Sequence, residues 1–250
     1  MKRALPALAF ALVLIGLWQL AAGLRLINPI FFPSPGRTFG ELYLQVASGR
    51  LWSPLASTAL RMLYGWLLAC AAGIALGAAI GSSRAAREYL EPLLDFLRPL
   101  PASAIIPVAI LFLGLSNAMS TAVIAFGSLW PVLLASVHGF KTTEPQLVEL
   151  CQALEMRRSE VLAKVALPGA LPDILSGVRV SLAIALILAV VTEMQASLPG
   201  LGRNILLAQR SFRSPELYAG IVVLGLMGFA VNHGLLLAER RLLRWRAASA

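Results

Sequence analysis

This sequence of 250 residues has little charge: 13% of its residues are charged and 58% are hydrophobic. A soluble domain averages about a quarter charged and about half apolar residues. A single water-exposed core cannot absorb this apolar excess. The composition therefore indicates a protein whose helices are solvated by lipid.

Cysteine and histidine are equally scarce. Cys70 and Cys151 are too few and too far apart for a disulfide framework, and His138 and His233 do not pair with them in any metal-binding spacing. We therefore expect no metal and no cofactor. The same scarcity leaves a membrane-embedded enzyme without a Ser/His/Asp or Cys/His set. The chain also lacks a GxxxxGK[ST] phosphate loop, so it cannot bind ATP by that route.

Weakly charged windows recur along the chain and do not alternate polar and apolar residues as barrel strands would. They predict an all-α, polytopic membrane protein with about six transmembrane helices, because a helix satisfies its own backbone in lipid. These windows cover residues 7–24, 55–81, 93–114, 118–138, 176–197 and 217–237. The first follows Met1-Lys2-Arg3 and could instead be a cleaved signal peptide. Its 18 residues reach about 27 Å, which favours a retained first helix.

Glycines recur in the second window at Gly65, Gly73, Gly77 and Gly81. The last three are four residues apart and share one helix face. Small residues on such a face allow helices to approach closely in lipid. The alternative is that glycine is simply common in membrane helices.

The net charge of +9 is not gathered on one basic face, so we expect no nucleic-acid partner. With six spans and a cytoplasmic N-terminus, the cytoplasmic side would carry 14 of the 21 Lys and Arg residues, which favours both termini inside. The seven on the external side would be Arg25, Arg37, Arg50, Arg61, Arg203, Arg210 and Arg213. No linker or long repeat divides the chain, so residues 1–250 are predicted to form a single transmembrane domain with its core at about 55–237.

The longest polar stretch between spans, about 139–175, would be cytoplasmic. Thr143 begins a helix-start signal, and the apolar residues that follow, from Leu147 to Leu154, recur at helical spacing. A second helical piece follows, and we expect Pro168 and Pro172 to break it before the next span. The apolar face of this two-helix hairpin needs a partner, either the chain's own helices or another protein.

At this hairpin the chain resembles the "EAA" loop of ABC-importer permeases of the nitrate/sulfonate/taurine type. The resemblance covers most of the chain and rests on an ordered set of motifs: Phe32-Pro33-Ser34-Pro35; Arg98-Pro99-Leu100-Pro101 with Pro107; Glu149 to Leu154; Leu167 to Pro172 with Gly177; Thr192-Glu193-Met194; Gly200-Leu201-Gly202; and Glu239-Arg240-Arg241 through Trp245-Arg246.

The resemblance implies the type I ABC-importer permease fold, with loop 139–175 coupling the chain to a separate ATPase subunit that hydrolyses ATP. It also implies a second permease copy, giving a homodimer, an external solute-binding protein, and a place in the bacterial inner membrane. The solute would be an organosulfonate, nitrate or a related anion. The implied coupling residues are Glu149, Leu150, Cys151, Ala153, Leu154, Glu155 and Met156, with Pro168, Pro172 and Gly177 shaping the loop.

The chain departs from the family at three of these positions. The family usually has alanine where this chain has Leu150 and Cys151, and glycine at the turn where it has Glu155. A left-handed conformation would cost Glu155 roughly 1 kcal/mol, unless the turn takes another form.

Ionisable residues at membrane depth are rare and usually functional. Glu193, beside Thr192 and Gln195, is a candidate for the translocation pathway, or else an interfacial carboxylate paired with an arginine such as Arg203. An ion-gradient-driven secondary transporter is the alternative function. It would place several carboxylates or broken helices at the bilayer midplane. Here only Glu193 and Asp95 are candidates, and both lie near span ends.

Overall fold

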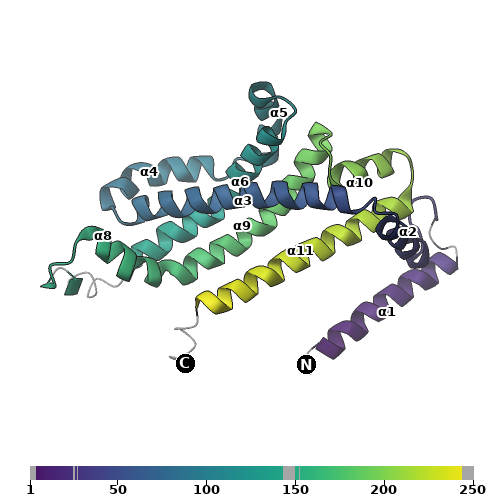
Figure 1. Cartoon of the computed structure of the whole chain (residues 1–250), viewed down its shortest axis with the longest axis horizontal. Coiled ribbons are helices and arrows are strands. Elements are labelled where there is room, and N and C mark those ends of the chain that lie inside the picture. Colours follow the sequence, from purple (N-terminus) through teal and green to yellow (C-terminus); the bar gives the residue numbers. More distant parts are fainter. Residues whose placement is uncertain (1–3, 25, 27, 143–149, 152, 244–250) are drawn as a thin grey trace.

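The computed structural model describes residues 4–24, 26, 28–142, 150–151 and 153–243, and it contains helices and no strand within these ranges (Figure 1). The helices are α1 (Ala4–Gly23), α2 (Pro35–Ala47), α3 (Trp52–Gly81), α4 (Arg84–Leu97), α5 (Ala102–Leu113), α6 (Asn117–Lys141), α8 (Arg158–Val161), a π-helical turn η1 (Leu162–Ala166), α9 (Leu167–Ala196), α10 (Leu201–Arg210) and α11 (Ser214–Leu242).

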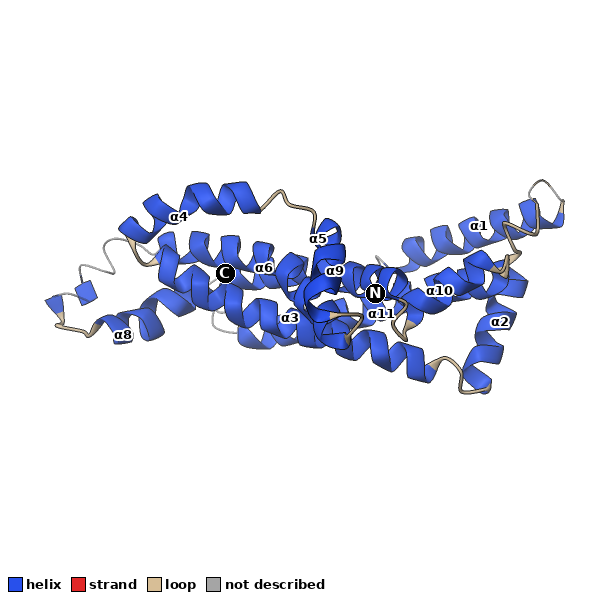
Figure 2. Cartoon of the chain, turned by 90° about the horizontal axis from the view of Figure 1, so that it is seen from above, coloured by secondary structure: helices blue, strands red, loops and turns tan. Residues whose placement is uncertain are grey.

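The centre of the fold is the packing of α6 between α3 and α9, which run side by side in Figures 1 and 2. The glycines of α3 make this possible. A Cβ atom at Gly65 would lie 2.5 Å from Ile124, and one at Gly81 would lie 2.7 Å from Phe140. The predicted close approach along Gly73 and Gly77 is confirmed, because a Cβ there would collide with Val132 and Ser136 of α6. Glycine thus lets the two backbones meet.

Four helices are long and apolar enough to cross a membrane: α3, α6, α11 and the continuous helix Leu162–Ala196. The bent pair of α4 and α5 makes at most a fifth among the described residues. The described residues thus contain four or five spans, somewhat fewer than the predicted six or so, and the all-helical polytopic class is confirmed. Of α1, the segment Leu12–Gly23 is an apolar helix shorter than a full span.

The predicted third span, 93–114, is broken. α4 and α5 meet at an angle of 91°, and α5 projects away from the bundle in Figure 1. Pro99 and Pro101 lie in the break, where proline cannot donate the hydrogen bonds that would continue α4. Hydropathy alone did not distinguish this broken pair from one straight span.

The prediction that Pro168 and Pro172 break the helix before the fifth span was wrong. η1 runs directly into α9, and the two form one helix from Leu162 to Ala196. Pro168 lies inside this continuous helix, just after the π-helical turn, a local adjustment of the kind that compensates for the hydrogen bond that proline cannot donate. Pro172 lies inside α9, a position that helices packed among neighbours in a membrane tolerate.

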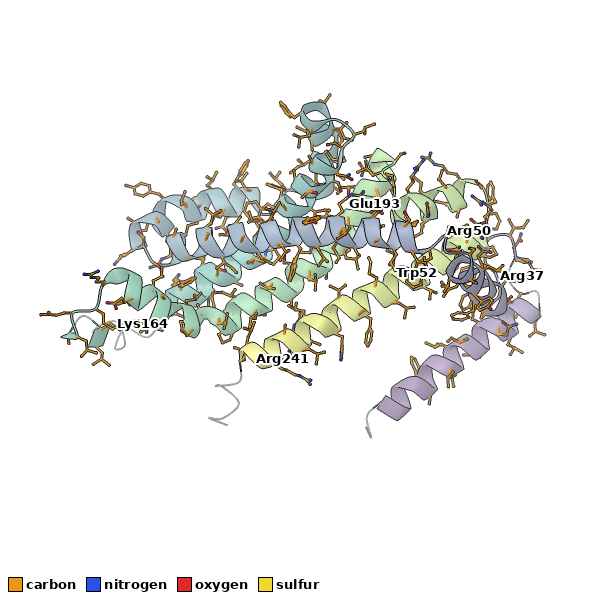
Figure 3. The ribbon with its side chains drawn as sticks, viewed as in Figure 1. Arg37, Arg50, Trp52, Lys164, Glu193 and Arg241 are labelled. Carbon is orange, nitrogen blue, oxygen red and sulfur yellow. The ribbon has the colours of Figure 1, made fainter. Side chains whose placement is uncertain are left out.

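The two ends of the helical body carry different structures. In Figure 3 the labelled Arg37, Arg50 and Trp52 lie at the end formed by α2 and α10, and Lys164 lies at the opposite end, beside α8. Glu193 lies between them, closer to the α2 and α10 end. The predicted coupling segment and the predicted pathway residues are therefore well separated.

Candidate functional site

The predicted coupling segment lies at the end of the body that carries α8 (Figure 1). Glu149 and the helix start at Thr143 lie outside the described residues. Leu150 and Leu154 are 55% and 65% exposed, whereas Cys151 is buried. Residues four apart share a helix face, so the two leucines present one apolar strip to the surroundings. The apolar face is therefore divided: Cys151 packs inward and the leucines remain uncovered.

Glu155 forms the turn that follows. Its φ of 54° is in the left-handed region, and the N–H of Met156 donates to the carbonyl of Cys151 at 3.0 Å. This six-to-one hydrogen bond is that of a Schellman helix end, in which the left-handed residue is usually glycine. The chain therefore makes with a glutamate a turn in which glycine is the usual residue.

The second helical piece, α8, starts at Arg158, two residues after Met156. The side chain of Glu160 accepts a hydrogen bond from the Arg157 N–H at 3.1 Å and another from Lys164 Nζ at 3.0 Å. The hydrogen bond from Lys164, followed by that from Arg157, lowers the pKa of Glu160 below its usual value. The described residues thus contain the end of the first helical piece, at Leu150 and Cys151, and the start of the second, and Ala153 lies exposed beside the turn between them.

Gly177 lies within α9 and not in a loop. A Cβ atom there would lie 2.5 Å from the carbonyl oxygen of Pro131 and 2.6 Å from Ala135 Cβ. Glycine at this position lets α9 pack directly on α6. The hairpin is therefore joined without a loop to a helix that is held tightly in the core.

Glu193 is fully buried and lies at the centre of a polar cluster. It forms an ion pair with Arg61 of α3. Its other oxygen accepts hydrogen bonds from Thr58 Oγ1 at 3.0 Å and from the Gly202 N–H at 2.8 Å. Thr58 Oγ1 also accepts from the Leu201 N–H at 2.9 Å. The cluster thus ties α3, α9 and the start of α10 together.

Arg61 extends the cluster to α6. Its guanidinium donates to Asn117 Oδ1 at 2.9 Å and 3.3 Å and to the Pro199 carbonyl at 3.2 Å. Gly200 and Gly202 are required beside the carboxylate: a Cβ at Gly200 would collide with the Glu193 carboxyl group, and one at Gly202 would lie 2.5 Å from the Val190 carbonyl. The Gly-Leu-Gly motif therefore closes over the buried ion pair.

The structure brings Thr192 and Glu193 together with this cluster but leaves Gln195 exposed. Thr192 is buried and its hydroxyl lies 2.6 Å from that of Ser120. The partner suggested for Glu193, Arg203, is exposed and forms no ion pair with it. Sequence reasoning assigned Arg61 to the external loops. The usable signal was an arginine inside a 30-residue helix, three residues after a threonine on the same face.

The spanning helices are apolar, and a buried polar cluster holds them together. At one end the hairpin leaves an apolar surface uncovered. These features define a multi-pass membrane subunit with a surface that a partner can cover. Within the described residues, no group of three His, Cys, Asp or Glu side chains is placed to hold a metal. Residues 69–246 match the family described as the binding-protein-dependent transport system inner membrane component, and the chain belongs to that family. It is therefore the permease subunit of an ATP-binding-cassette importer of the inner membrane.

Several curated relatives span almost the whole chain. It is 34% identical to the Bacillus subtilis permease SsuC, named for aliphatic sulfonates, over 94% of this chain and 85% of SsuC. It is 31% identical to the taurine permease TauC of Escherichia coli, over 93% and 86%. It is 27% identical to the nitrate import permease NrtB of Leptolyngbya laminosa, over 92% and 85%. The resemblance stated from the motifs is confirmed.

Solved structures agree on the fold. The inward-facing MetNI methionine ABC transporter matches with a TM-score of 0.63 at 15% identity, over 76% of this chain and 93% of the matched chain. An amino acid ABC transporter matches with a TM-score of 0.62 at 15% identity, over 80% and 97%. The family and the curated relatives place ATP hydrolysis on a separate subunit. They also exclude the alternatives of an ion-driven transporter and a membrane enzyme.

Proposed function

We propose that this chain carries a small sulfonate-type or nitrate-type anion across the inner membrane, as one of two identical permease copies. An external binding protein delivers the solute, and an ATPase subunit docks on the hairpin around residues 149–156. All of residues 1–250 act as a single transmembrane domain, with its core at about 55–237 and its coupling loop at about 139–175.

The exposed strip of Leu150 and Leu154 carries the coupling proposal. Two large apolar side chains that are more than half exposed, beyond the ends of the spanning helices, indicate a surface covered by a partner. A Schellman turn at residues 154–157 joins the strip to α8, and α8 continues through η1 into α9. A force applied at the hairpin therefore crosses only this short turn before it reaches the centre of the fold. Glu149, the acidic position of the family motif, directly precedes the strip.

The solute class rests on the names of the relatives, which concern aliphatic sulfonates, taurine and nitrate. We place the hairpin and both termini on the cytoplasmic side, because Lys and Arg concentrate in the loops and tails assigned to that side. Thr192, Glu193 and Gln195 then belong to the external end of the pathway. There Glu193 holds the helices together through Arg61.

The coupling proposal is tested by purifying the permease with its ATPase subunit. We expect Leu154→Glu to reduce co-purification at least tenfold, because it places a charge in an apolar contact. Tyr43→Glu, at a 71% exposed position on α2 at the opposite end of the body, is the matched control and should leave co-purification unchanged. Equal recovery of the ATPase with both variants would reject the docking site.

The orientation and the solute need separate experiments. Single cysteines at 154 and 203 in a cysteine-free background should react with a membrane-impermeant maleimide from the cytoplasmic and the external side, respectively. Labelling of residue 154 from outside would reject the proposal. A binding screen on the partner solute-binding protein, followed by growth on each bound compound as sole sulfur or nitrogen source, identifies the solute.

A further inference from the structure

Three cavities of the structure differ in the charged groups that line them. One of about 170 Å³ contains both acidic and basic side chains, among them the ion pair of Arg213 and Glu216. One of about 300 Å³ contains Arg179, which forms an ion pair with Glu239. The third, of about 570 Å³, is lined by α5, α6, α9 and the α4–α5 break, and its one charged lining residue is Arg98.

This third cavity, here called the central groove, lies at the middle of the spanning helices. Its walls include Gly127 and Pro131 of α6 and Ile184 of α9, all far from the ends of their helices. Solute sites in transporters occur at this depth, where broken helices meet. The volume is also within the usual range of a small-molecule site.

α4 folds back along the body and brings Arg98 to the central groove. Leu94 and Leu97 pack on the buried cluster that contains Trp130 and Leu133, so the next residue, Arg98, lies at the depth of Trp130. The bend at the prolines then directs α5 away from the bundle (Figures 1 and 2). The break in the predicted third span is therefore what places a cation beside the groove.

Three side chains that line the groove carry hydrogen-bond donors with no partner among the described residues. Arg98 and Ser103 are exposed, and neither side chain forms an ion pair or a hydrogen bond with another described residue. The indole N–H of Trp130, a residue only 9% exposed, is buried without an acceptor. A buried donor without an acceptor is unfavourable, and an oxyanion supplies acceptors only. The remaining walls are apolar, which suits a short carbon chain better than a second polar group.

We propose that Arg98 contacts the oxyanion headgroup of a transported organic sulfonate, whose carbon chain lies against the apolar walls of the central groove. This inference rests on the proposed anion-import function and adds the residue that would recognise the charge. Ser103 lies on the same wall and would donate a second hydrogen bond. Charge-assisted hydrogen bonds of this kind are the strongest available for such a headgroup.

The test uses the whole complex of two permeases, ATPase and binding protein in proteoliposomes, with radiolabelled ethanesulfonate as the probe. Arg98→Gln should lower uptake at sub-saturating probe by about tenfold or more, as expected for the loss of one charge-assisted contact. Stimulation of ATP hydrolysis by the loaded binding protein should stay within twofold of the wild-type value. Arg98→Lys, which keeps the charge, should retain most of the uptake.

Two further variants keep the test decisive. Arg203→Gln removes an exposed arginine of α10 that lines none of the three cavities, and should change neither uptake nor ATP hydrolysis. Ser103→Asp places a carboxylate in the groove and should abolish uptake while ATP hydrolysis continues.

Two results for Arg98→Gln would overturn the inference. If the complex with this variant takes up ethanesulfonate normally, or loses uptake and ATP hydrolysis in equal proportion, Arg98 is not a solute contact. If the wild-type complex transports only nitrate, or no anion at all, the proposed solute class fails whatever Arg98 does.

Discussion

The buried ion pair of Arg61 and Glu193 makes the most quantitative prediction. Replacing Glu193 with Leu leaves a guanidinium that is 7% exposed with only Asn117 Oδ1 and the Pro199 carbonyl as acceptors. Breaking a buried ion pair by removing one partner costs about 3–5 kcal/mol, because the other charge remains buried and uncompensated. We therefore expect Glu193→Leu to lower the free energy of unfolding by that amount, and Arg61→Met to do the same.

The double variant separates a charge effect from a packing effect. Arg61→Met with Glu193→Leu removes both charges, and apolar replacements of a buried pair are often neutral. What remains is the loss of the acceptor for the Gly202 N–H, about 1–3 kcal/mol for one buried group. The Thr58 hydroxyl can still donate to the Pro54 carbonyl, which lies at 3.1 Å. The double variant should therefore be less destabilised than the sum of the two single variants, by at least about 2 kcal/mol.

The assay is reversible unfolding of the purified permease in mixed micelles, read as a double-mutant cycle. The control pair is Arg84 and Glu88 of α4, whose side chains are 88% and 63% exposed. Removing either partner of an exposed pair should cost less than about 1 kcal/mol. If the two buried substitutions each cost as little as the control, or if their effects are additive, the ion pair does not hold these helices together.

Three other substitutions test separate parts of the structure. Gly77→Ala should cost about 1–3 kcal/mol in the same unfolding assay, because its Cβ would collide with Ser136. Gly225→Ala, with open space around it, should be neutral or slightly stabilising. Equal effects of the two substitutions would contradict the close packing of α3 on α6. Glu155→Gly should slow hydrogen exchange at the hairpin turn, because it relieves about 1 kcal/mol of left-handed strain, and unchanged exchange would show that the turn is not strained. Leu154→Ala should weaken ATPase docking less than Leu154→Glu does. A titration of the ATPase subunit onto permease liposomes measures both affinities, and equal binding to the two variants would contradict an apolar contact.

Hydropathy predicted the class of the fold because lipid imposes a strong constraint on every spanning segment. The predicted second and fourth windows became α3 and α6 with ends shifted by only a few residues. Hydropathy failed where the course of a helix depends on its packing against neighbouring helices. The break between α4 and α5 leaves enough apolar residues to resemble one span, and Pro172 was expected to end a helix that its neighbours support.

The candidate site was predicted to a similar degree. The left-handed conformation of Glu155 was one of two turn forms that the sequence left open, and the structure shows it. The partner of Glu193 did not follow, since Arg61 is 132 residues away along the chain. Hydropathy counts a lone arginine near a span end as a loop charge. Only the packing of α3 against α9 turns it inward.

The positions of strong and weak connections limit how this permease can move. Glycine contacts join α3 to α6, Gly177 joins α6 to α9, and the Arg61–Glu193 cluster fixes all three to the start of α10. Changing the angle between these helices would require separating charges or backbones already in contact, so they form one rigid body. α5 belongs to the same body, because Gly127 lets Ala102 pack closely on α6 and Ile106 is buried against Met119 and Val123. Force from the hairpin enters this rigid body through α9. The change in access to the central groove should therefore come from the movement of this body against its second copy, and not from bending within α3, α6 or α9.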